Sequence, residues 1–187
     1  MAEEEQTDPT PPTLQFQVTL YPNPVLRKEA PPVETFDQDL ADTVRAMFER
    51  MYASGGVGLA APQVGISRRI MVLNATGEPE DEIVLINPRI VDKSGPETLF
   101  DEGCLSFPGI YAEVKRPDEC TVRAQGLDGE EFEASYAGFP SRIVQHEYDH
   151  LEGVLLVDRM SPADKQRHKS ALADLVDAYK RSRAAAG

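Results

Sequence analysis

Cysteine, histidine and tryptophan are scarce in this chain, whose 187 residues include two cysteines, three histidines and no tryptophan. The cysteines, Cys104 and Cys120, do not form the dense pattern of a disulfide-stapled secreted domain. No apolar stretch is long enough to cross a membrane, and no basic region followed by an apolar one opens the chain. We therefore expect a cytoplasmic protein with no membrane partner.

Positive charge is also in short supply, because 19 Lys and Arg residues face 32 Asp and Glu residues, giving a formal net charge of -13. Broad binding to nucleic acid needs basic side chains that displace counterions from phosphates. The composition therefore argues against a DNA partner. A hydrophobic share of 41% over this length is enough for one domain with its own core.

The first residues differ from the rest of the chain. Residues 1–13 combine Glu3, Glu4 and Glu5 with three prolines, a composition with little to bury. We expect a disordered acidic and proline-rich leader over 1–13, followed by a single folded domain over 14–187.

Apolar residues at helical spacing follow Asp37 and end before Gly55 and Gly56, which predicts an N-terminal helix. Two more helices are expected, one over Ser141–Leu151 and a C-terminal one over Ser161–Ser182, opened by a capping serine and a proline.

Between these helices, short β-type runs separated by turn signals predict a meandering, mostly antiparallel sheet. The runs are Arg69–Asn74, Glu82–Asn87, Ile110–Lys115, Cys120–Gln125 and Glu131–Tyr136, and the turn signals are Asn87-Pro88, Arg116-Pro117 and Asp128-Gly129. The fold class expected from these elements is α+β.

Two of the histidines occur in the segment His146-Glu147-Tyr148-Asp149-His150. Residues four apart lie on one face of a helix, so His146 and His150 can bind the same metal ion. Glu147 would then lie beside the ion. The alternative, two structural histidines on a helix, carries little weight in a chain with so few histidines.

A third ligand is needed, and zinc peptidases with this helix take it from further along the chain. No glutamate follows Glu152, and His168 falls in a different predicted helix. Cys104 is the better candidate, because a thiolate binds metals strongly and Gly103 allows the backbone to approach the ion closely. The alternative fate of a free cysteine, a small buried hydrophobe, suits Cys120.

Three protein ligands leave one coordination position open, which is typical of a hydrolase that activates water. A structural metal module would need four ligands, and the sequence offers no convincing fourth. The glycine-rich segment Gly55–Gly65 lacks the Gly-Lys-Ser/Thr ending of a phosphate loop and is not a dinucleotide fingerprint. Its glycines are better suited to let a peptide backbone lie close.

Three motifs together resemble the signature motifs of the peptide deformylase family, and they occur in the family's order. They are Gly56-Val57-Gly58-Leu59-Ala60-Ala61-Pro62-Gln63, Glu102-Gly103-Cys104-Leu105-Ser106 and Gln145-His146-Glu147-Tyr148-Asp149-His150. The resemblance extends from about Leu20 to the last helix. It implies mostly antiparallel sheets around a central metal-binding helix, with one helix near the N-terminus and one at the C-terminus.

The resemblance implies a hydrolase that removes the formyl group from the N-terminal formylmethionine of newly synthesised proteins and releases formate. It implies that Cys104, His146 and His150 hold one divalent metal ion. The family commonly uses Fe²⁺, and the same ligands also accept Zn²⁺, Ni²⁺ or Co²⁺.

The resemblance also assigns the catalytic roles. Glu147 would take a proton from the attacking water and pass it to the departing nitrogen. The side-chain amide of Gln63 and the backbone N–H of Leu105 would stabilise the oxyanion.

For the substrate, the resemblance implies that Gly58 pairs with the peptide backbone and that Val57, Phe139 and Ile143 surround the methionine side chain. Arg142 is a polar residue near this pocket, so the sequence does not define the pocket rim. Two alternatives to a deformylase stay open: a metallopeptidase that cleaves ordinary peptide bonds, and an inactive deformylase-like protein that binds N-termini without turnover. The partners expected from the resemblance are nascent formylmethionyl peptides in bacteria.

The last segment, 161–187, has a net charge of +3 in an acidic chain. Its charged residues are Lys165, Arg167, Lys169, Lys180, Arg181 and Arg183, against Asp164, Asp174 and Asp177. A basic terminal helix suggests a docking element that touches the ribosome, from which the substrate emerges. A solvated helix face is the alternative explanation.

Overall fold

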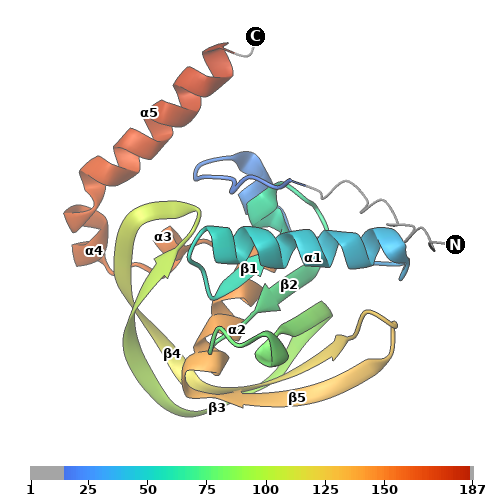
Figure 1. Ribbon diagram of the computed structural model, residues 1–187. Helices are drawn as coiled ribbons and strands as arrows, with labels where there is room; N and C mark the ends of the chain where they lie inside the picture. Colours follow the sequence, from blue (N-terminus) through green and yellow to red (C-terminus); the bar gives the residue numbers. More distant parts are fainter. Residues whose placement is uncertain (1–14, 186–187) are drawn as a thin grey trace, which may run out of the picture.

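The computed structural model describes residues 15–185 and has an α+β fold (Figure 1). Five strands form one sheet in the order β1-β2-β3-β4-β5, and every neighbouring pair is antiparallel. The α+β class and the antiparallel meander predicted from the sequence are confirmed. The leader expected over 1–13 lies outside the described residues.

The elements have the following bounds. The strands are β1 (Gly58–Ala60), β2 (Ile70–Leu73), β3 (Ile83–Cys104), β4 (Phe107–Gln125) and β5 (Glu131–Ala137). The helices are α1 (Gln38–Ala53), α2 (Gly138–Leu151), α3 (Leu156–Arg159), α4 (Pro162–Arg167) and α5 (Lys169–Ala185). Short 3₁₀ helices are η1 (Pro24–Arg27), η2 (Ala61–Val64) and η3 (Pro79–Asp81).

Strand β2 lies between α1 and α2. Alternate residues of a strand face opposite sides of a sheet, and here Ile70 and Val72 belong to the core cluster of α1, whereas Met71 and Leu73 belong to that of α2. All four side chains are fully buried. The continuous apolar run of β2 is explained by this burial on both faces.

Helix α1 confirms the prediction made from its apolar spacing. The side chain of Asp37 accepts a hydrogen bond from the Leu40 N–H and caps the first turn. Gly55 follows the helix with φ of 68°, a conformation that glycine adopts without strain. The buried stripe predicted from the sequence faces the sheet through Leu40, Val44, Met47, Phe48 and Met51.

Strands β3 and β4 form a long twisted hairpin that curves round α2 (Figure 1). The turns predicted at Asn87-Pro88 and Arg116-Pro117 are wrong, because both dipeptides lie inside these strands. The β3–β4 register shifts between Ile86 and Arg89, and again just before Glu97, the residue opposite Pro117. Prolines are tolerated in a sheet at such irregularities. The turn at Asp128-Gly129 does separate β4 from β5.

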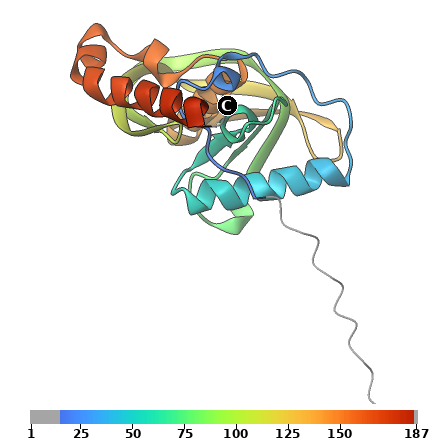
Figure 2. The same ribbon diagram turned by 90° about the horizontal axis from the view of Figure 1, so that it is seen from above.

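The helix predicted over Ser161–Ser182 is divided at His168 into α4 and α5. Ser161 caps α4, as its sequence predicted, and Asp164 accepts a hydrogen bond from its hydroxyl. In Figure 1, α5 extends away from the sheet, and the view from above separates the α4–α5 pair from α1 (Figure 2). No residue of α5 is buried. Within residues 15–185, no helix is both long and apolar enough to span a membrane.

The end of α2 is tied to the N-terminal part of the chain by Gly153. Its φ is 70°, and an added Cβ would lie 2.5 Å from the backbone oxygen of Arg27 at the end of η1. Glycine is required here both for the left-handed conformation and for the close approach of two backbone segments.

We predict that Gly153→Ala destabilises the protein more than Gly77→Ala. A left-handed conformation costs alanine roughly 1–2 kcal/mol at either position. Gly77 has φ of 87° but open space at its Cβ, so only Gly153→Ala adds a clash with backbone. Urea unfolding of the two variants checks the order, and equal loss in both would show that the contact with Arg27 is unimportant.

Candidate metal centre

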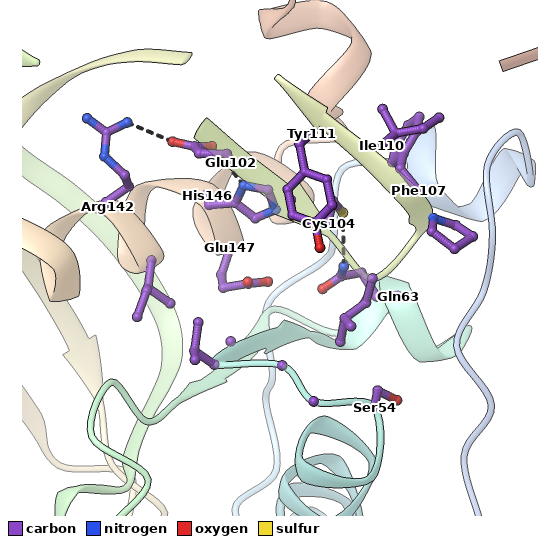
Figure 3. Close-up of a pocket in the computed structure, with 18 of the residues that line it drawn as sticks. Ser54, Gln63, Glu102, Cys104, Phe107, Ile110, Tyr111, Arg142, His146 and Glu147 are labelled. Carbon is purple, nitrogen blue, oxygen red and sulfur yellow. Dashed lines mark hydrogen bonds and ion pairs between the residues drawn. The ribbon is translucent and has the colours of Figure 1, made fainter. Parts of the chain in front are cut away.

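One cavity of about 600 Å³ gathers most of the site residues predicted from the sequence. It lies between β1, the end of β3 and α2, and Figure 3 shows the side chains that line it. The predicted residues that line it are Val57, Gly58, Gln63, Cys104, Leu105, Phe139, Ile143, His146 and Glu147. Three segments far apart in the sequence thus meet at one place.

Cys104, His146 and His150 present three ligand atoms that lie within 4.8 Å of one another. The Cys104 Sγ is 3.3 Å from the Nε2 of His150. The two histidine rings come from successive turns of α2, with centroids 5.2 Å apart. A thiolate and two imidazoles are soft-to-borderline ligands that suit a transition metal ion.

The electrostatics of the cluster also favour a cation. Burial would lower the pKa of His146, but hydrogen bonds to Cys104 and Glu102 raise it well above its usual value. Negative groups around that ring therefore favour a positive charge, which a divalent ion would supply in place of the proton. Burial lowers the pKa of His150 well below its usual value, so this imidazole is in the neutral form that binds metals.

Glu147 lies beside the cluster and is buried on α2. Burial raises its pKa to about 7 from a usual value of 4.5, and the positive charge of His146 offsets this only in part. Among the described residues, its Oε2 has no hydrogen-bond partner although it is buried. A carboxylate with one free oxygen and a pKa near neutrality is suited to take up and release a proton.

Gln63 is oriented by the backbone of its own motif. Its Oε1 accepts a hydrogen bond of 2.8 Å from the Ala60 N–H, so the amide nitrogen must face the other way. That Nε2 lies 3.6 Å from the Cys104 Sγ (Figure 3). It also lies 3.4 Å from the Ser106 Oγ, and both contacts are long. The amide N–H groups of Gln63 thus point towards the cluster formed by Cys104, His146 and His150, and they make only long hydrogen bonds.

The segment that precedes η1 connects the motif that contains Gln63 to the motif that contains Cys104. The Thr19 N–H donates to the backbone oxygen of Gln63, and the Tyr21 N–H donates to that of Ser106. The ring of Tyr21 also stacks on Phe107, with centroids 4.9 Å apart. One extended segment therefore bridges the chain on both sides of the cavity, a contact that the sequence did not predict.

Glu102 is the hydrogen-bond partner of His146, a role that the sequence did not indicate. Its Oε2 lies 3.0 Å from the Nδ1 of His146, which leaves Nε2 for a metal. Arg116 donates to both oxygens of Glu102, and Arg142 donates to one. Burial would raise the pKa of Glu102, but the bonds from His146 and Arg116 outweigh it and lower the pKa to about 2.

Arg142, which left the pocket rim undefined in the sequence, is buried, and both of its terminal nitrogens donate hydrogen bonds. Besides Glu102, it donates to the backbone oxygens of Val114 and Thr98. Its guanidinium stacks on Phe100, whose ring packs in turn against Phe139 at a centroid distance of 5.9 Å. Arg142 therefore forms part of the pocket wall, and its terminal nitrogens are taken up by contacts within the protein.

Tyr111 is a lining residue that sequence reasoning missed. Gly103 lies opposite it in the β3–β4 pair, and a Cβ on Gly103 would be 2.6 Å from the tyrosine ring. The glycine before Cys104 thus makes room for Tyr111, whereas the sequence had suggested room for the metal. No sequence pattern could have paired these two residues, because their contact depends on strand register.

The family profile for polypeptide deformylase matches residues 15–166. A chloroplast and mitochondrial peptide deformylase 1B of Arabidopsis thaliana is 51% identical over 154 residues, covering 79% of this chain and 56% of that protein. The peptide deformylase of Thermotoga neapolitana is 44% identical over 160 residues, covering 86% of this chain and 96% of that protein.

Solved structures give the same result. The Arabidopsis thaliana peptide deformylase 1B structure is 46% identical, covers 89% of this chain and 93% of that one, and superposes with a TM-score of 0.86. The Plasmodium falciparum peptide deformylase is 42% identical, covers 88% of this chain and 98% of that one, and also has a TM-score of 0.86.

We predict that Arg116→Met destabilises the protein by about 3–5 kcal/mol, because it leaves Glu102 and Asp149 as buried carboxylates that have lost a partner. The control is Arg123→Met, which removes an exposed ion pair with Glu133 and should cost at most about 1 kcal/mol. Urea unfolding measures both. A loss below about 1 kcal/mol for Arg116→Met would contradict the importance of this network.

Proposed function

Because the chain belongs to the polypeptide deformylase family, we propose that its own residues carry out the family's reaction as follows. Members of the family are metal-dependent hydrolases that remove the formyl group from the N-terminus of new proteins, and this is the activity of the chain. The two alternatives that the sequence left open, a metallopeptidase and an inactive binding protein, have no support.

The observation that carries the proposal is the cluster of Cys104, His146 and His150 with the free carboxylate oxygen of Glu147 beside it. We propose that these three residues hold one divalent metal ion and that α2 is the central metal-binding helix. When bound, the metal supplies Lewis-acid chemistry that makes water nucleophilic near neutral pH. Fe²⁺ is the proposed ion, with Zn²⁺, Ni²⁺ or Co²⁺ as substitutes for the same ligands.

Glu147 is the proposed proton carrier. Its unpartnered Oε2 can accept the proton of the attacking water and deliver it to the nitrogen that leaves as the new N-terminus. The pKa of about 7 supports both steps, since a group that titrates near the working pH can act as base and then as acid.

Gln63 and Leu105 are the proposed oxyanion donors. The Ala60 N–H turns the amide of Gln63 so that its Nε2 faces the cluster. The backbone N–H of Leu105, which follows Cys104 directly, would be the second donor. Two fixed donors stabilise the negative oxygen of the tetrahedral intermediate, and one such donor typically contributes about 100- to 1,000-fold in rate.

The substrate would lie beside the start of β1, at the exposed Val57 and the buried Gly58, with its methionine side chain against the wall formed by Phe139 and Ile143. These residues line the same cavity, and most of that cavity's lining is apolar. A pocket of this kind matches an unbranched thioether side chain. Nascent formylmethionyl peptides are the proposed partners.

Two further proposals concern the domain organisation and the location of the protein. One is a single catalytic domain over 14–187. The other is a bacterial cytoplasmic location, which the two unpaired cysteines support because disulfides are rare in that compartment.

The deciding experiment is formate release from a short formyl-Met peptide by protein purified anaerobically and loaded with Fe²⁺ or Ni²⁺. An unformylated peptide serves as control and is watched for backbone cleavage. We expect formate from the first peptide and no cleavage of the second. Cleavage of the control would favour a peptidase, and no reaction with metal bound would favour a binding protein.

Two variants separate metal binding from proton transfer. Glu147→Ala should keep its metal and lose nearly all turnover, because general acid–base catalysis typically contributes about 100- to 10,000-fold. Cys104→Ala should lose the metal. Metal analysis beside the formate assay distinguishes the two effects, and full activity of Glu147→Ala would refute the assigned role.

The finer partner proposal is that α4 and α5 touch the ribosome. Arg167 pairs with Asp164 and Lys180 pairs with Asp177, but Lys165, Lys169, Arg181 and Arg183 make no ion pair within the described residues. Lys165 belongs to α4, and the other three belong to α5, which extends away from the sheet (Figure 1). Such a surface suits phosphate-rich RNA.

Reversal of these four charges should weaken co-sedimentation with ribosomes at low salt and leave formate release from a short peptide unchanged. The reason is that phosphate contacts weaken as positive charge is lost, whereas the cavity is not altered. Binding that does not change on charge reversal would leave the solvated helix face as the explanation.

A further inference from the structure

Gly58 is a glycine that the backbone does not require. It lies in β1, where it pairs with Leu73 of β2 in regular antiparallel register. It is absent from the glycines with positive φ, so alanine could adopt its conformation. Glycine weakens a strand interior, and its presence there often marks a close approach by another group.

The group that approaches Gly58 belongs to the chain itself. A Cβ added at this position would lie 2.5 Å from the Oε1 of Glu147 and 2.9 Å from its Cγ. It would also lie 2.7 Å from the Cγ2 of Ile143. Real Cβ atoms essentially never come within 3.0 Å of another heavy atom, so Glu147 and Ile143 fill the space that a side chain would need.

Helix α2 cannot easily withdraw to make that space. Its opposite side is held by buried hydrogen bonds, from Arg116 to Asp149 and to the backbone oxygen of Gln145, and from Gln145 to the backbone oxygen of Pro117. Ile143 and Glu147 are four residues apart and therefore face β1 together. A side chain at position 58 would have to displace the Glu147 side chain rather than the helix.

The resemblance to the family predicts that the space at Gly58 serves the substrate backbone. Gly58 does line the cavity, so its backbone can still pair with a peptide. The position of its missing Cβ, however, is taken up by Glu147 and Ile143. The two explanations differ in what an alanine would damage: substrate binding in one, placement of the carboxylate in the other.

We propose that Gly58 is a positioning residue for Glu147, and that the absence of its side chain lets the carboxylate lie against β1 with Oε1 while Oε2 stays free in the cavity. This inference rests on the proposed role of Glu147 as proton carrier. A displacement of about 1 Å in a catalytic group can cost about 100-fold in rate.

The test is Gly58→Ala in the full chain loaded with Ni²⁺. We expect kcat for formate release to fall about 100-fold, with KM, metal content and the Kd of an unformylated Met-Ala-Ala peptide each within about threefold of the parent, since the peptide-binding backbone is retained. A rise of KM and of this Kd with kcat retained would overturn the proposal and return Gly58 to substrate binding alone.

The matched control is Gly126→Ala. Gly126 also lacks a positive φ, and its added Cβ would lie 2.8 Å from a carboxylate oxygen of Asp128, in the turn between β4 and β5 and outside the cavity. We expect its kcat to equal that of the parent. An equal fall in both variants would show a general effect of alanine for glycine and would overturn the proposal.

Two double variants, in which Gly58→Ala is combined with a second substitution, identify the side chain that is displaced. In Glu147→Asp the 2.5 Å contact with Oε1, the shorter of the two contacts with Glu147, is removed and the contact at Cγ remains, so adding Gly58→Ala should lower kcat by clearly less than the loss it causes in the parent. In Ile143→Ala the Cγ2 contact is gone but the carboxylate contact remains, so Gly58→Ala should still cost about 100-fold. The same fold loss in the Glu147→Asp background would overturn the proposal.

The outcome for Glu147→Ala keeps this inference separate from the proposed function. Full activity of Glu147→Ala removes the proton-carrier role and the reason for positioning it. Loss of activity in Glu147→Ala with normal kcat in Gly58→Ala removes the positioning role of Gly58 and leaves the proposed function intact.

Discussion

The buried carboxylate of Glu102 is the interaction on which the site depends. A carboxylate inside a protein is stable only when its charge is matched by fixed donors. Arg116, Arg142 and His146 supply those donors, and they come from β4 and from two turns of α2. The same bonds that stabilise the charge therefore dock α2 against the long hairpin and orient one ring of the cluster formed by Cys104, His146 and His150.

The docking of α2 is tight on its other side as well. Its apolar residues pack under β2, and its Glu147 meets β1 at the one residue of that strand with no side chain. A helix held between an ion network and a strand has little freedom to shift. This rigidity keeps the cluster ligands and the carboxylate in fixed relative positions, which is what a site that stabilises developing charge requires.

Local patterns predicted the helices and the strand direction well, and they failed where tertiary pairing overrode a local signal. The stripe of α1 and the histidine spacing of α2 depend only on helical periodicity, which is readable in sequence. Asn87-Pro88 and Arg116-Pro117 are common in turns, but here register shifts in the β3–β4 pair absorb the two prolines inside continuous strands. The three-residue strand β1 was missed because it is too short to show alternation.

The sequence by itself determined which residues are candidates for the chemistry: the spacing of His146 and His150 and the scarcity of cysteine and histidine single out the metal-ligand candidates, and the resemblance to the family adds Glu147 and Gln63. Only the tertiary structure decided what surrounds them. Glu102 as the partner of His146, Arg142 as a pocket wall, Tyr111 over Gly103 and Glu147 over Gly58 are contacts between segments far apart in the chain. Such contacts depend on strand register and helix docking, which minimise buried unpaired charge and empty volume over the whole molecule and leave no local pattern.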